Sequence, residues 1–182
     1  IPKIDFRELT YYNKKRKSTL LIVKKGILMK KITLLLVLLS MFLISCQSGA
    51  DKAAIYDDDS LIALTEDSYY YSVYEDSSET IANQMVLDFR SFSGRDTLFS
   101  LTVTAESSIT LSYQSNVEVG NLKLVIVDEA SQVQTLFSGQ NDSSTSLTLS
   151  EGTYMIKLVG SKAFGDIDLL ITYPTGVTIT KP

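Results

Sequence analysis

The chain has 182 residues, a net charge of −4, one cysteine and no histidine. Without histidine it cannot use Ser-His-Asp or Cys-His catalysis, nor a zinc site with histidine ligands. A single cysteine excludes an intramolecular disulfide. The length suits one domain with appendages.

The charge is divided sharply along the chain. Residues 1–45 contain ten Lys or Arg and two acids, a net charge of +8, whereas residues 46–182 contain seven Lys or Arg and 19 acids, a net charge of −12. Proteins bind phosphate backbones by displacing counterions with Lys and Arg. We therefore expect no nucleic-acid binding by the acidic part.

The basic part begins with residues 1–28, which have no periodic apolar pattern. Met29, followed by Lys30 and Lys31, is a more natural start than Ile1. We interpret residues 1–28 as upstream sequence included by an over-long gene prediction. The alternative is a genuine cytoplasmic extension.

An uncharged apolar segment of fourteen residues follows, Ile32–Ser45. As a helix it spans about 21 Å, less than the roughly 30 Å hydrocarbon core of a bilayer. A short apolar segment behind a basic start, ending in a small residue, is typical of a cleavable export signal. The sequence predicts a signal peptide over residues 29–45.

The signal ends in Leu43-Ile44-Ser45-Cys46, which contains the single cysteine. This tetrapeptide resembles the lipobox of bacterial lipoproteins, in which an apolar and a small residue precede an invariable cysteine. The resemblance implies cleavage between Ser45 and Cys46, and a diacylglyceryl group on the Cys46 thiol. It implies a lipid-anchored protein on the exported side of the cell membrane or outer membrane, and Gln47 after the cysteine implies the outer membrane in a Gram-negative cell.

Residues 46–66 are small, polar and acidic, and they predict a flexible tether behind the lipid. We interpret Asp57, Asp58 and Asp59 as solvated spacer, because the EF-hand calcium pattern is absent. Leu61–Leu64 is compatible with a short helical turn or with a strand.

From about residue 67 to 176 apolar and polar residues alternate, the pattern of half-buried strands. Phe99, Leu101 and Val103 share one face of such a strand, and residues 122–127 read as a central strand covered on both faces. We predict an all-β fold, an antiparallel two-sheet β-sandwich or jelly roll of about eight or nine strands of about 5–9 residues each. Residues 177–182 are expected to be a tail. The predicted turns are Ser93–Asp96, Gly120–Asn121, Asp128–Ser131, Gly139–Asp142, Glu151–Gly152 and Gly160–Lys162.

The last hairpin, about residues 152–169, is loosely similar to that of bacterial pre-peptidase C-terminal domains. The likeness rests on Gly152-Thr153-Tyr154 and on alternation over about 20 residues. It implies a small secreted β-sandwich and nothing about ligands.

The most distinctive surface candidate is the tyrosine strand, Tyr69, Tyr70, Tyr71 and Tyr74. On a regular strand Tyr69 and Tyr71 lie on one face, and Tyr70 and Tyr74 on the other. Exposed tyrosines would offer a platform for a sugar or a partner protein. The alternative is that tyrosine simply favours strands and covers an edge of the sandwich.

Acidic residues form the second candidate group. Paired carboxylates serve glycoside hydrolysis or calcium binding, but acids on strands also limit edge-to-edge aggregation, and we favour this structural role. The hydroxyl-rich run Asp142–Ser146 is expected to be a polar loop. The acids are Glu66, Asp67, Glu75, Asp76, Glu79, Asp166 and Asp168.

The sequence thus predicts an exported lipoprotein whose acidic sandwich is a non-catalytic binding or envelope-structural module. We expect no cofactor, no metal site and no enzyme activity. The expected partners are the membrane, through the lipid on Cys46, and an unknown envelope protein or glycan. A carbohydrate-binding role for the Tyr69–Tyr74 strand is the first alternative, and a carboxylate-dependent hydrolase is the least favoured.

Overall fold

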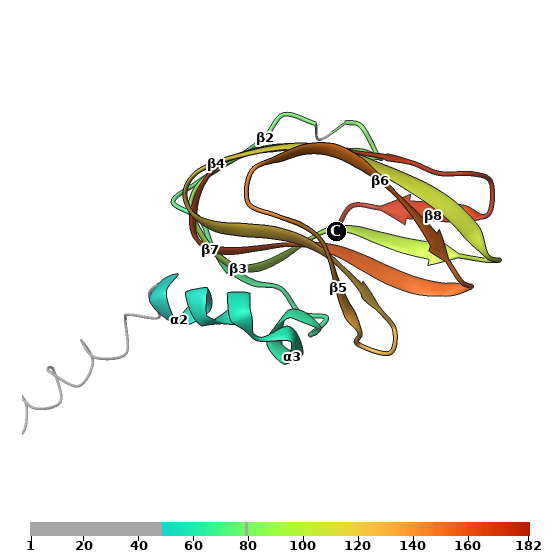
Figure 1. Cartoon of the computed structure of the whole chain (residues 1–182), viewed down its shortest axis with the longest axis horizontal. Helices are drawn as coiled ribbons and strands as arrows, with labels where there is room; N and C mark the ends of the chain where they lie inside the picture. The colour runs from blue at the N-terminus through green and yellow to red at the C-terminus, as the bar shows by residue number, and fades with distance from the viewer. Residues whose placement is uncertain (1–48, 79) are drawn as a thin grey trace, which may run out of the picture. The chain divides into compact units, whose positions relative to one another are not determined.

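The computed structural model describes residues 49–182 except Glu79. The predicted upstream extension, the signal and the lipidation site therefore lie outside the described residues. All strand pairs in the described part are antiparallel, and they form one eight-stranded sheet that is bent into two layers (Figure 1). The predicted all-β sandwich is confirmed.

The chain begins with three short helical turns and continues as strands. The helical turns are α2 (Gly49–Ala53), the 3-10 turn η1 (Ala54–Asp57) and α3 (Asp59–Ile62). The strands are β1 (Ser68–Tyr70), β2 (Val73–Asp76), β3 (Gln84–Val103), β4 (Ser107–Asp128), β5 (Val133–Ser138), β6 (Asn141–Leu149), β7 (Gly152–Thr172) and β8 (Val177–Thr180).

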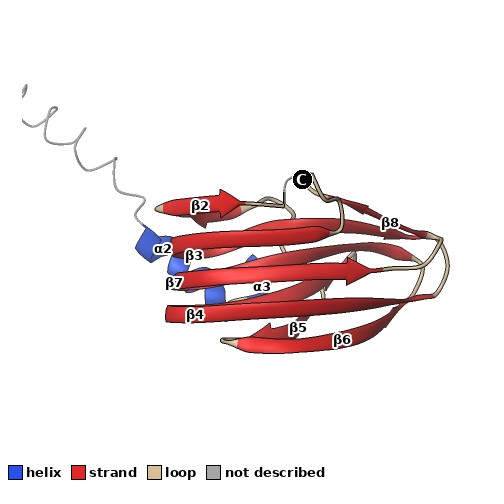
Figure 2. Cartoon of the chain, turned by 90° about the horizontal axis from the view of Figure 1, so that it is seen from above, coloured by secondary structure: helices blue, strands red, loops and turns tan. Residues whose placement is uncertain are grey.

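The three central strands run through both layers. β3, β7 and β4 have 20, 21 and 22 residues, and they lie side by side along their length (Figure 2). The first layer contains β2, the first half of β3, the second half of β7, the first half of β4 and β6. The second layer contains β1 and β8, followed by the other halves of β3, β7 and β4, and finally β5.

The strands bend together at a line that we call the corner, residues 91–94 of β3, 117–121 of β4 and 160–165 of β7. The strand pairing shifts register there, and Ser91, Gly120 and Lys162 have positive φ. Glycine is required where strands meet closely: a Cβ on Gly165 would lie 1.9 Å from the Asn116 carbonyl oxygen. Three predicted turns therefore are wrong, because residues 93–96, 120–121 and 160–162 bend continuous strands.

The main core lies between the layers, where the alternating apolar side chains of both inner faces meet. The predicted inward set of Phe99, Leu101 and Val103 is confirmed, each at most 2 % exposed. The rest of the core includes Leu87, Phe89, Phe92, Ile109, Leu111, Tyr113, Leu124, Ile156, Leu158, Ile167, Leu169 and Ile171.

A second, smaller core lies on the outer face of the second layer. Residues 49–67, which we call the cover, pack across this face, and Ile55 and Ile62 contact Val125, Val127 and Val159. This corrects the predicted flexible tether. The prediction failed because only two buried apolar side chains anchor a segment that is otherwise small and acidic. As expected for residues 122–127, β4 is covered on both faces.

Local hydrogen bonds explain the turns of the cover. Asp58 caps α3, because its carboxylate accepts from the backbone N–H groups of Ser60 and Leu61 at 3.0 and 3.2 Å. The hydrogen bond from the Ser60 side chain, together with these, holds the pKa of Asp58 below its usual value. Asp58 is thus a helix cap rather than solvated spacer, and Leu61–Leu64 begins as a helical turn.

The C-terminal boundary also changes. Residues 177–180, expected to be part of a tail, form β8 against the end of β3. Val177 and Ile179 are 7 % and 8 % exposed and belong to the main core. The sandwich therefore includes β8.

Candidate functional site

The predicted lipid site, Leu43, Ile44, Ser45 and Cys46, lies outside the described residues. Within residues 49–182, Glu79 aside, no helix is both long enough and apolar enough to span a bilayer. In the same part of the chain, no group of three or more His, Cys, Asp or Glu side chains is arranged to hold a metal ion.

The tyrosine strand closes one side of the sandwich. β1 pairs with β3 at the corner, and β2 pairs with β3 in the first layer, so the chain crosses between layers at Tyr71 and Ser72. The Tyr71 ring stacks on Phe92, with centroids 4.4 Å apart, and its hydroxyl donates to Asp96 Oδ2 at 2.8 Å. Tyr71 is therefore a structural residue.

The other tyrosines lie around this buried ring. Tyr69 and Tyr74 contact Tyr71, with centroid distances of 5.3 and 5.0 Å. Tyr69, Tyr70 and Tyr74 are 45 %, 45 % and 47 % exposed. The expected division into two faces is wrong, because the strand is interrupted between Tyr70 and Val73 and Tyr74 lies beside Tyr71.

Burial controls the ionisation of the groups under the tyrosines. It raises the pKa of the Tyr71 hydroxyl. Burial also raises the pKa of Asp96 to about 6, although the Tyr71 hydrogen bond acts in the opposite direction. For Tyr69, the charge of Asp96 is the main cause of a raised pKa.

A buried cation fastens the cover to the second layer. The Lys157 ammonium donates to the Leu64 carbonyl and lies 3.8 Å from Asp67 Oδ1, and the side chain is 0 % exposed. Asp67 also accepts from the Thr97 N–H at 3.0 Å, and Arg95 Nε donates to the Glu66 carbonyl at 2.9 Å. Burial lowers the pKa of Lys157.

Sequence reasoning missed the roles of Lys157 and Arg95. On alternation alone, Lys157 belongs to the outer face of its strand and would be solvated. A signal was present, because Met155 and Val159 share that face, and such a face is apolar enough to be covered.

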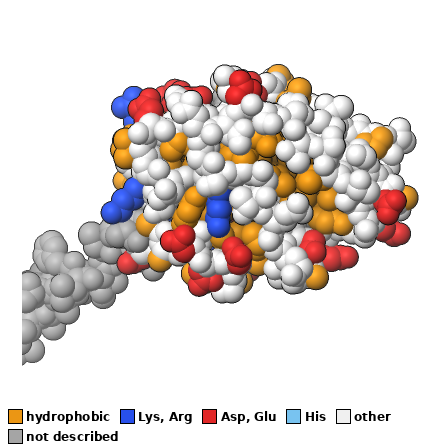
Figure 3. Space-filling view, in the orientation of Figure 1, with side chains coloured by type: hydrophobic (Ala, Val, Ile, Leu, Met, Phe, Trp, Pro, Cys, Tyr) orange, Lys and Arg blue, Asp and Glu red, His pale blue; other side chains and the backbone are white. Residues whose placement is uncertain are grey.

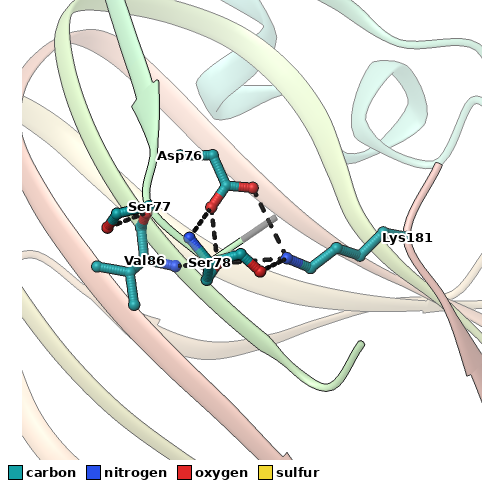
Figure 4. Close-up of polar contacts among 5 residues, drawn as sticks. All are labelled: Asp76, Ser77, Ser78, Val86 and Lys181. Carbon is teal, nitrogen blue, oxygen red and sulfur yellow. Dashed lines mark hydrogen bonds and ion pairs between the residues drawn. The ribbon is translucent and has the colours of Figure 1, made fainter. Parts of the chain in front are cut away.

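Asp76 has a similar structural role at another position (Figure 4). Its carboxylate accepts from the N–H and hydroxyl of Ser78, at 2.7 and 2.6 Å, and lies 3.7 Å from the Lys181 ammonium. The Ser78 hydroxyl in turn accepts from the Val86 N–H. These contacts tie the chain after β2 to β3 and to the C-terminus. Asp67, Asp76 and Asp96 are thus held in structural contacts.

The outer face of the first layer, which we call the open face, is polar and exposed. Glu75, Asp88 and Asp166 are neighbours in strand register across β2, β3 and β7. Asp168 lies next along β7 and accepts from Gln84 Nε2 at 2.9 Å. The face has shallow hollows lined by carboxylates, amides and hydroxyls, including Gln84, Gln114, Asp142 and Asp168. Of the predicted acids that the structure describes, Glu75, Asp166 and Asp168 come together here.

The hydroxyl-rich run is not the expected loop. Residues 142–146 belong to β6, where they pair with residues 110–114 of β4. Their hydroxyls bond across the strands, with Thr110 to Ser146 at 3.2 Å and Ser112 to Ser144 at 3.3 Å. Cross-strand hydroxyl pairs stabilise a sheet, and this explains the run structurally.

The sequence matches no protein-family model and no curated protein. Among solved structures, it is similar to a family 35 carbohydrate-binding module from an environmental isolate, with 18 % identity over 63 % of this chain and 82 % of that one, at a TM-score of 0.33. A second is the pre-peptidase C-terminal domain of a collagenase from Bacillus anthracis, with 14 % identity over 43 % and 85 % of the two chains, at a TM-score of 0.32. A third is a carbohydrate-binding module of lichenase 5A from Cellvibrio mixtus, in complex with cellotriose, with 10 % identity over 72 % and 95 %, at a TM-score of 0.34. We assign no ligand to this chain on such distant likenesses.

Proposed function

We propose that this protein is an exported lipoprotein, anchored by a lipid on Cys46, whose acidic sandwich is a non-catalytic binding or envelope-structural module. One observation carries the proposal: the single cysteine ends the tetrapeptide Leu43-Ile44-Ser45-Cys46, directly after a basic start and an uncharged apolar segment. All described helices and strands follow Cys46. Cleavage between Ser45 and Cys46 would therefore leave every described helix and strand in the mature protein. A diacylglyceryl group supplies two acyl chains, enough for stable anchoring.

The binding role rests on the open face. The cover occupies the outer face of the second layer, whereas the outer face of the first layer presents carboxylates, amides and hydroxyls to solvent. The proposed partner is an envelope protein or glycan that contacts this polar surface.

We propose the absence of catalysis because several carboxylates are engaged in structural contacts. Asp67, Asp76 and Asp96 are each held by structural hydrogen bonds, so they are poor candidates for general acids or bases. A hydrolase would use carboxylates of the open face, where Asp166 and Asp168 lie. Activity lost on Asp166→Asn and Asp168→Asn would favour it.

The anchor is tested by fractionating cells that express the full chain. Cys46→Ser should move the protein from the membrane to the soluble fraction, and mass spectrometry should find a lipid on Cys46 in the unchanged protein. Ser48→Ala, two residues away, is the matched control and should stay in the membrane. Retention of Cys46→Ser in membranes would mean that the apolar segment is itself the anchor.

A carbohydrate-binding role for the tyrosines is the second candidate. It is favoured by the exposure of Tyr69, Tyr70 and Tyr74 around one buried ring. On a glycan array, Tyr70→Ala with Tyr74→Ala should abolish retention while an open-face change, Gln114→Ala, leaves it unchanged. Unchanged retention in the double variant would remove this candidate.

A further inference from the structure

The start of the described chain lies at one end of the sandwich. α2 packs beside the corner, where β3, β7 and β4 turn from one layer into the other (Figure 1). The Lys52 ammonium donates to the Tyr69 carbonyl at 2.6 Å, which ties α2 to β1 at this end. A chain of three residues spans at most about 10 Å, so a lipid on Cys46 would be tethered within that reach of Gly49.

The corner carries exposed aromatic and apolar side chains. Tyr69 and Tyr70 pair with Gly94 and Ser93, the residues at which β3 bends. Val119, on the bend of β4, is 57 % exposed. Exposed tyrosines and a large apolar side chain suit the boundary between water and lipid, where rings bury their apolar body and keep the hydroxyl wet.

Cationic side chains also lie at this end. Lys52, Arg90 and Lys162 lie at or beside the corner; the Lys162 N–H donates to the Ser93 hydroxyl, and Arg90 immediately precedes the bend of β3. The carboxylates of Asp51, Glu118 and Asp166 are also there, so cations and carboxylates are mixed at this end of a strongly acidic domain. Long cationic side chains can lie along a lipid surface and reach the headgroups.

The opposite end has the reverse character. The connections at residues 104–106, 128–132, 150–151 and 173–176 contain Glu106, Asp128, Glu129 and Glu151 and no Lys or Arg. On the face drawn in Figure 3, blue side chains lie at the α2 end and near the middle, red side chains lie at both ends, and the far end shows no blue. An anionic membrane would repel that end and accept the corner.

We propose that the corner is a membrane-contacting surface, formed by Tyr69, Tyr70, Val119, Arg90 and Lys162, which lies on the lipid headgroups once Cys46 is anchored. The partner is a bilayer surface containing anionic lipid. This inference rests on the proposed lipoprotein function and adds an orientation to it. The corner contacts the membrane, and the acidic end points away from it.

The test measures depth at two single cysteines in the full, lipidated protein. Lipid on Cys46 leaves no other free thiol in the sequence, so Val119→Cys and the matched control Glu106→Cys each provide one site for an environment-sensitive fluorophore. The proteins are reconstituted into vesicles of phosphatidylethanolamine and phosphatidylglycerol, with or without a lipid that bears a nitroxide near its headgroup. Emission from residue 119 should shift to shorter wavelength and be quenched severalfold more strongly than emission from residue 106.

Equal quenching at residues 119 and 106, with lipid found on Cys46 by mass spectrometry, would overturn the orientation and leave the lipoprotein proposal standing. Absence of lipid on Cys46 would overturn both. Glu118→Cys provides a second site at the corner should Val119→Cys fail to fold. Equal quenching together with loss of glycan retention in Tyr70→Ala would assign the tyrosines to sugar rather than lipid.

Discussion

The two outer faces of the sandwich differ in what lies on them. On the second layer, Val125, Val127 and Val159 are buried by Ile55 and Ile62 of the cover. On the first layer, most residues at equivalent outward positions are carboxylates, amides and hydroxyls, with Leu170 as an apolar exception. One face is thus part of the fold and the other is available for contact. The comparison separates residues that stabilise the protein from residues that are free to serve its function.

Ile62→Ala should have the largest effect, because Ile62 is 0 % exposed in the smaller core. Replacing a buried isoleucine with alanine lowers stability by about 2–5 kcal/mol. Chemical denaturation should record this loss, and hydrogen exchange should accelerate across the cover. The control is Leu170→Ala on the open face, at 37 % exposure. Equal losses in the two variants would contradict the distinction between the faces.

Lys157→Met should loosen the polar half of the cover. The change keeps most of the side-chain volume but removes the ammonium, leaving the Leu64 carbonyl and Asp67 without this partner. Leaving a buried polar group without its hydrogen-bond partner lowers stability by about 1–3 kcal/mol. The loss of stability is measured as a change in the free energy of unfolding. The loosening of the cover is measured by hydrogen exchange at residues 64–67.

Lys123→Met is the matched control for Lys157. Lys123 is also on the outer face of the second layer, but it is partly exposed and pairs with exposed Asp59 at 3.9 Å. A surface pair of this kind contributes about 0–1 kcal/mol. A loss in Lys123→Met as large as in Lys157→Met would mean that burial of Lys157 adds nothing.

The sequence predicted the layers better than the connections between them. Alternation identified the inward set that includes Phe99, Leu101 and Val103, because that signal depends only on the period of a strand. It did not reveal that three strands continue through the corner. Gly120 has a positive φ, which serves a turn and a bulged strand equally well, so local chemistry could not distinguish them.

The cover was missed for a different reason. Ile55 and Ile62 are isolated among small and acidic residues, and their burial depends on distant strands that pattern analysis does not bring together. The same limit applies to the tyrosine strand, where the contact between Tyr71 and Phe92 decides which rings are buried. Cys46 lies outside the described residues, and its lipidation stays a prediction.

Asp96 should make the free energy of unfolding depend on pH. Its pKa in the folded protein is about 6, above its ordinary value of 3.8, because the carboxyl is buried. The folded state therefore holds this proton more tightly than the unfolded state. The contribution of Asp96 to stability is full below about pH 4 and is lost as the pH rises to about 6. The change is on the order of 1–3 kcal/mol.

The comparison of wild type with Asp96→Asn isolates this effect from the other carboxylates. The free energy of unfolding of wild type minus that of the variant should fall between pH 4 and pH 6 and stay level above. A difference that rises with pH over this interval would mean that the hydrogen bond from Tyr71 outweighs burial.

The smallest effect is expected on the open face, and its sign is informative. Asp88 lies between Glu75 and Asp166 in strand register, so like charges are neighbours across three strands. Asp88→Asn should raise the free energy of unfolding by about 0.2–1 kcal/mol, because facing like charges are destabilising. The gain should shrink at high salt, which screens exposed charges.

The salt dependence of Asp88→Asn also bears on function. Gln114→Glu, which adds a carboxylate beside Asp168 in strand register, should have the opposite effect and the same salt dependence. If instead Asp88→Asn lowers stability at every salt concentration, the carboxylate row contributes to the fold. If the predicted gain is found, stability does not account for three adjacent carboxylates. Protection against edge-to-edge aggregation or contact with a partner would then account for an acidic open face.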